Sequence, residues 1–75
     1  MLSRKAPSVN IGDRFMKVGD QYGRAWTVMR LWTTLDGLPH VRLQSDGQDQ
    51  ETRIISLSAL VDVHFYVRAQ GAGEA

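Results

Sequence analysis

A chain of 75 residues can fill one hydrophobic core, so it forms a single domain at most. With 43% hydrophobic and 23% charged residues it has the composition of a folded domain, and the absence of cysteine excludes a disulfide framework and a thiolate metal site. A formal net charge of +1 is too small to indicate nucleic-acid binding on its own, and no apolar run approaches the roughly 18 residues that span a bilayer. The N-terminal segment lacks the apolar stretch of a secretory signal, so we expect a cytoplasmic protein with no membrane anchor.

Short runs rich in Val, Ile, Thr and aromatic residues, separated by turns that contain Gly and Asp, predict an all-β domain over residues 11–69. The segments 1–10 and 70–75 lack apolar periodicity, and we expect both to be disordered tails. The expected strands are 14–18, 25–34, 40–44, 51–56 and 61–68. Leu57 and Leu60 are spaced for one 3₁₀ turn before the last strand.

Alternation of apolar and polar residues sets the expected core. In the second strand Trp26 and Val28 share a face, but Arg30 occupies the next inward position. A β-bulge near Met29 would return Leu31 to the inside. The predicted core is Phe15, Val18, Trp26, Val28, Leu31, Val41, Leu43, Ile54, Leu57, Leu60, Val63, Phe65 and Val67.

Five strands with a 3₁₀ turn between the fourth and fifth resemble the SH3-like small barrels. Gly12-Asp13 before the first strand, Gly19 and Gly23 around the first loop, and Val28 resemble the KOW motif of ribosome- and transcription-associated barrels. The whole chain is similar to small bacterial barrel domains of uncharacterised families. The resemblance implies an all-β, five-stranded SH3-like barrel and carries no particular activity.

Residues that could support catalysis are few. Asp62 and His64 would face the same side of a strand, and such a pair can orient an imidazole. The chain has 2 histidines, however, and a catalytic zinc site takes three protein ligands. Ser56 and Ser58 lie where hydroxyls cap a helical turn rather than in a nucleophile elbow. We therefore expect no enzyme activity, no metal and no cofactor.

The arginines of the predicted strands suggest a basic surface. Asp36-Gly37 is a strong hairpin signal, so the second and third strands should pair antiparallel. Arg30, Arg42 and Arg53 lie on the second, third and fourth strands, whereas the aspartates fall in turns or at strand ends. The three arginines could cluster on one outer face, although the register of the fourth strand leaves the direction of Arg53 open.

Trp32 would point outward near the end of the second strand, two residues after Arg30. It could stack a base beside phosphates held by Arg30, Arg42 and Arg53, or it could pack under the hairpin turn. Arginine stems could equally cover the sheet and deter aggregation. The sequence thus predicts a non-catalytic binding module. The leading hypothesis for its partner is single-stranded nucleic acid or a nucleoprotein. A protein-interaction or homo-oligomerising module is the alternative.

Overall fold

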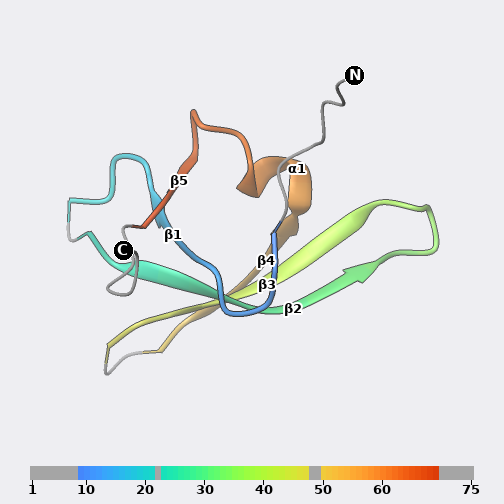
Figure 1. Ribbon diagram of the computed structural model, residues 1–75, viewed down its shortest axis with the longest axis horizontal. Coiled ribbons are helices and arrows are strands. Elements are labelled where there is room, and N and C mark those ends of the chain that lie inside the picture. The colour runs from blue at the N-terminus through green and yellow to red at the C-terminus, as the bar shows by residue number, and fades with distance from the viewer. Residues whose placement is uncertain (1–8, 22, 48–49, 70–75) are drawn as a thin grey trace, which may run out of the picture.

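The computed structural model describes residues 9–21, 23–47 and 50–69, which form one antiparallel sheet and a single helical turn. Figure 1 shows the elements in chain order: β1 (Arg14–Lys17), β2 (Ala25–Thr33), β3 (Pro39–Ser45), β4 (Thr52–Ser56), α1 (Leu57–Leu60) and β5 (Tyr66–Arg68). The first four strands lie within about two residues of their expected bounds. The all-β prediction is confirmed.

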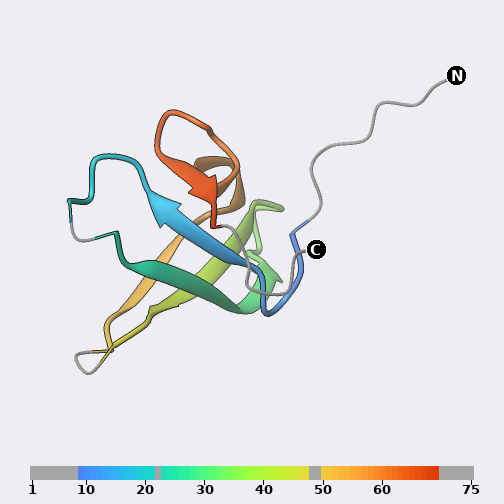
Figure 2. The same cartoon turned by 60° about the vertical axis from the view of Figure 1, so that its left-hand side comes forward.

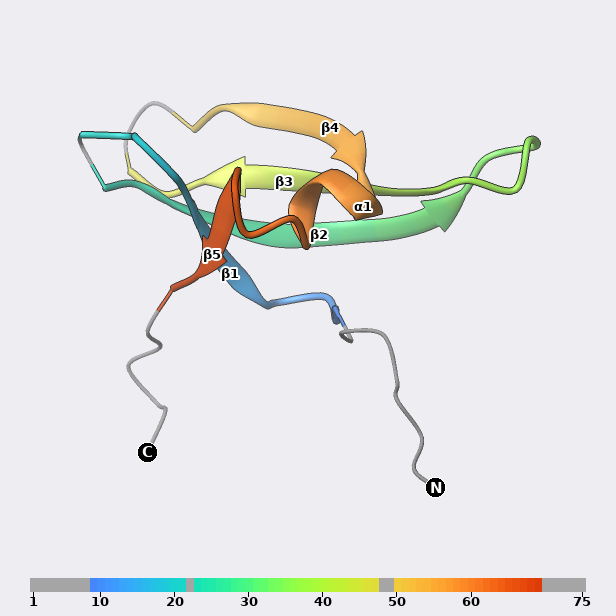
Figure 3. The ribbon, with the colours of Figure 1, turned by 90° about the horizontal axis from the view of Figure 1, so that it is seen from above.

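The five strands have the order β4-β3-β2-β1-β5, and every pair is antiparallel. β1 lies between β2 and β5 (Figure 2). The register of β2 against β3 shifts between Val28 and Arg30, which confirms the expected bulge. Seen from above, β1 and β5 point in a different direction from β2, β3 and β4 (Figure 3). The sheet is strongly bent but does not close, because its edge strands β4 and β5 do not pair with each other.

The core lies on the concave face of this sheet, where α1 packs against β3 and β4. Its buried members are Phe15, Trp26, Val28, Val41, Leu43, Leu60 and Tyr66. Leu31 and Leu57 are partly buried and pack against this cluster. All of them except Tyr66 belong to the core that the sequence predicts.

Five residues expected in the core are instead exposed: Val18, Ile54, Val63, Phe65 and Val67. Val63, Phe65 and Val67 are exposed because residues 61–65 form a turn and not a strand. The amides of Phe65 and Tyr66 both donate to the carbonyl of Asp62, at 2.9 and 3.0 Å. β5 therefore starts only at Tyr66, and Tyr66 points inward where Phe65 and Val67 were expected.

The expected 3₁₀ turn is one turn of α-helix, in which the amide of Val61 donates to the carbonyl of Leu57 at 3.1 Å. Ser56 caps it as expected, because its hydroxyl accepts a hydrogen bond from the amide of Ala59 at 3.2 Å. Of the expected tails, residues 1–8 and 70–75 lie outside the described part of the chain. Val9 packs against the core.

Candidate binding face

Two pairs of side chains form adjacent rows on the outer face of β2 and β3. Arg30 lies directly opposite Arg42, and Trp32 lies directly opposite His40. Val41 and Leu43 alternate with these residues on β3 and are fully buried, so the two rows lie on the face turned away from the core. We call Arg30, Trp32, His40 and Arg42 the Arg–Trp face. The hairpin that carries it extends away from the rest of the molecule (Figure 1).

The two arginines of this face place like charges side by side. Both residues are exposed, and cross-strand partners are close enough for like charges to repel. Within residues 9–21, 23–47 and 50–69, neither guanidinium forms an ion pair with an acidic side chain. An anion between them would relieve this repulsion.

The aromatic row is ordered by three contacts. The rings of Trp32 and His40 stack at 26° with their centroids 6.0 Å apart. The guanidinium of Arg30 lies over the Trp32 ring, 5.3 Å from its centroid. His40 Nδ1 lies 3.1 Å from the carbonyl oxygen of Leu38, and since a carbonyl only accepts, Nδ1 carries the hydrogen. The row is thus fixed in orientation while both rings stay partly exposed.

Arg53, a candidate member of this group whose direction the sequence left open, lies on the other side of the sheet. It is paired with Leu43, and its guanidinium lies over the buried Trp26 ring, 4.8 Å from the centroid. Ile54, expected inside, takes the outer position opposite Arg42. His40 is the member of the face that the sequence reasoning missed. Its signal was its alternation with Arg42 on β3 and its position opposite Trp32 across the hairpin.

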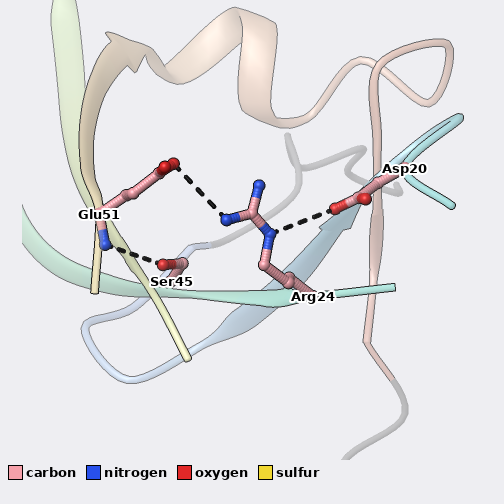
Figure 4. A network of polar contacts seen from close by, with 4 residues as sticks. All are labelled: Asp20, Arg24, Ser45 and Glu51. Atoms are coloured by element: carbon pink, nitrogen blue, oxygen red, sulfur yellow. Dashed lines mark hydrogen bonds and ion pairs between the residues drawn. The ribbon is translucent and has the colours of Figure 1, made fainter. Parts of the chain in front are cut away.

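A second arginine on the inner side, Arg24, forms ion pairs with two acidic side chains (Figure 4). Its Nε lies 3.7 Å from a carboxylate oxygen of Asp20, and its Nη1 lies 3.6 Å from one of Glu51. The Glu51 amide donates to the hydroxyl of buried Ser45 at 2.9 Å. This network joins the start of β2 to the loop between β3 and β4. Because two carboxylates lie beside Arg24, the charge of Arg24 is compensated within the fold.

Two further arginines are also paired. Arg14 forms an ion pair with Asp46, and Arg68 Nη1 lies 3.1 Å from Asp13 Oδ2. These pairs join segments that are distant in sequence. They contrast with Arg30 on the outer face.

Asp62 and His64 do form a pair, but in the exposed turn before β5 rather than on a strand. The carboxylate of Asp62 accepts from the His64 amide at 2.9 Å and contacts His64 Nδ1 at 3.0 Å. These hydrogen bonds hold the pKa of Asp62 below its ordinary value. No cluster of three or more His, Cys, Asp or Glu side chains with metal-binding geometry occurs among the described residues.

A pocket of about 180 Å³ lies at the other end of the molecule, beside β5 and the turn that precedes it. It is lined by Phe15, Val61, Val63, Tyr66, Val67 and Arg68. The lining is mostly apolar, and Val63 and Val67 are themselves exposed. This pocket differs in character from the Arg–Trp face.

Compared with known proteins, the chain matches no family model, no curated protein and no solved structure. Within the described ranges, no helical segment has the length and apolar character needed to cross a membrane.

Proposed function

We propose that this chain is a non-catalytic binding module that holds single-stranded nucleic acid on its Arg–Trp face, on a fold of SH3-like barrel type. The fold type is supported by the strand order and by the single helical turn between β4 and β5. The observation that carries the function is the direct pairing of Arg30 with Arg42, neither of which forms an ion pair with an acidic side chain of the described residues.

Phosphate is the anion that best suits this arrangement. Guanidinium groups donate in a planar fork that matches phosphate oxygens, and binding phosphate would offset the cross-strand repulsion. The adjacent aromatic row stays partly exposed, so a base can stack on the ring surface that Arg30 and His40 leave uncovered; bases are exposed in single strands and stacked away in a duplex. The small net charge of the chain fits a local contact better than a broad electrostatic surface.

The test is a titration of the whole chain with single-stranded DNA and RNA over a series of salt concentrations. We expect affinity to fall with salt, and Arg30→Ala or Arg42→Ala to weaken binding and flatten the salt slope by about 0.7–1 unit each. Lys17→Ala removes the same charge from β1, outside the face, and should leave the slope unchanged. Absence of binding at low salt, where the electrostatic attraction is greatest, would refute the proposal.

A protein-interaction or homo-oligomerising module is the second candidate, favoured by one observation. Val63 and Val67 are exposed and line the apolar pocket beside the edge strand β5, and Phe65 in the preceding turn is exposed as well. Sedimentation over a range of concentrations tests self-association. This candidate requires a mass that rises with concentration in the parent and stays monomeric in Val63→Asp.

A further inference from the structure

One row of the Arg–Trp face is charged and the other is aromatic, and the two rows lie two residues apart along each strand. Arg30 and Trp32 are two residues apart on β2, as are Arg42 and His40 on β3. Residues i and i+2 of a strand are about 6.6–6.8 Å apart. A charged row therefore lies beside an aromatic row, at a separation comparable to that between a phosphate and the base of the same nucleotide.

Stacking of Arg30 on Trp32 favours the phosphate at the charged row. The guanidinium lies over the ring, 5.3 Å from its centroid, and none of the ion pairs among the described residues involves it, so its N–H groups can donate to a phosphate. The ring also limits the directions that the guanidinium can adopt, so less freedom is lost on binding. Arg42 lies opposite and supplies the second fork.

The hairpin turn favours the base at the aromatic row. Beyond Trp32 and His40 the chain turns through residues 34–38, closed by hydrogen bonds from the Thr34 amide to the Leu38 carbonyl and from the Gly37 amide to the Thr34 carbonyl. The exposed carboxylate of Asp36 lies in this turn. It would repel a phosphate placed on that side but not an uncharged base.

We infer that the Arg–Trp face binds one nucleotide unit in a fixed orientation, with its phosphate at Arg30 and Arg42 and its base at Trp32 and His40, toward the turn. This inference rests on the proposed function and adds a base-dependent part to the electrostatic part. It makes the ligand a base-bearing strand rather than a polyanion in general. An acidic or phosphorylated peptide would satisfy the charged row but would leave the aromatic row without a base.

The experiment compares a short oligothymidylate with an abasic oligomer of the same length and charge, each titrated against the full chain at one low salt concentration. We expect the base-bearing strand to bind about 5- to 150-fold more tightly, the effect of stacking one base. Trp32→Leu keeps an apolar side chain but removes the ring, so it should remove most of this preference, and it should weaken abasic binding only by the smaller factor that follows from the lost restraint on Arg30. Trp32→Phe should retain part of the preference, and Arg42→Ala should weaken both ligands by the same factor.

The possible results separate this inference from the proposed function. If the parent binds both oligomers equally and Arg42→Ala still weakens both, nucleic-acid binding stands but the fixed orientation is wrong. If Trp32→Leu weakens both oligomers by the same factor, Trp32 supports the face without stacking a base, and the inference is again wrong. If a phosphopeptide binds more tightly than either oligomer, or if neither oligomer binds, both proposals fail.

Discussion

Both tryptophans of this domain have an arginine over the ring, yet they occupy opposite environments. Trp26 is 1% exposed, with the guanidiniums of Arg53 and Arg24 at 4.8 and 5.4 Å from its ring centroid. Trp32 is only partly buried, with Arg30 at 5.3 Å. Similar distances therefore accompany very different degrees of burial.

The two tryptophan sites differ in burial, and they also differ in the partners of Arg24 and Arg30. On the inner side, Arg24 is paired with Asp20 and Glu51, so its charge is neutralised within the fold (Figure 4). On the outer face Arg30 has another arginine as its cross-strand partner. A tryptophan–arginine contact by itself does not distinguish architecture from binding. Burial does, and it assigns Trp26 to the core.

The largest expected effect separates the two tryptophans by stability. Trp26→Ala removes the largest fully buried side chain and should lower the free energy of unfolding by about 3–5 kcal/mol. Small domains often have only about 5 kcal/mol in total, so this variant should be close to unfolding. Trp32→Ala should cost about 1 kcal/mol or less, because its surroundings are partly solvent. Urea unfolding followed by circular dichroism measures both, and equal losses would contradict the comparison.

The second expected effect concerns the short edge strand β5. Tyr66 is 5% exposed and Phe65 is 53% exposed. Tyr66→Ala should therefore cost about 3 kcal/mol, and Phe65→Ala should stay within about 0.5 kcal/mol of the parent. Thermal melting of the two variants tests this register. A greater loss of stability for Phe65→Ala than for Tyr66→Ala would mean that Phe65 points inward, as the sequence alternation predicted.

The same pair shows where sequence reasoning stops. Val63, Phe65 and Val67 alternate perfectly, and alternation predicts one buried face. The capacity of Asp62 to close a turn does not appear in that pattern. Its carbonyl accepts the amides of Phe65 and Tyr66, which delays the strand and reverses the inward face.

The outer face was more predictable than the β5 edge. The Asp36-Gly37 turn joins its two strands directly, and the bulge was visible as an arginine at an inward position of β2. The placement of Arg30, Trp32 and Arg42 on one face followed from these local signals. Arg53 was not predictable in this way, since Ile54 and Ile55 offer either register to β4.

A smaller effect is expected from two arginines with opposite roles. Arg53→Ala removes the guanidinium and stem that cover Trp26 and should cost about 1–2 kcal/mol. Arg42→Ala removes a like-charge neighbour of Arg30 and should leave stability unchanged or slightly raised. Denaturant midpoints at low and high salt measure both. If Arg42→Ala is the more destabilising of the two, the outer face has a structural role that its contacts do not explain.

The smallest expected effect concerns the ion pair between Asp13 and Arg68. Asp13 accepts a hydrogen bond from the Asn10 amide at 2.9 Å and from Arg68 Nη1 at 3.1 Å. These hydrogen bonds, the backbone one first, lower the pKa of Asp13 in the folded state despite some desolvation. Because the folded pKa lies below the unfolded one, the stabilisation is complete above about pH 4 and is lost as the pH falls through the folded pKa.

Asp13→Asn removes this dependence. The parent should therefore be more stable than the variant near neutral pH, and the difference should shrink as the pH falls below about 4. Urea midpoints across that range measure it. A difference that stays constant with pH would mean that Asp13 acts through hydrogen-bond geometry alone, because an asparagine titrates nowhere in this interval.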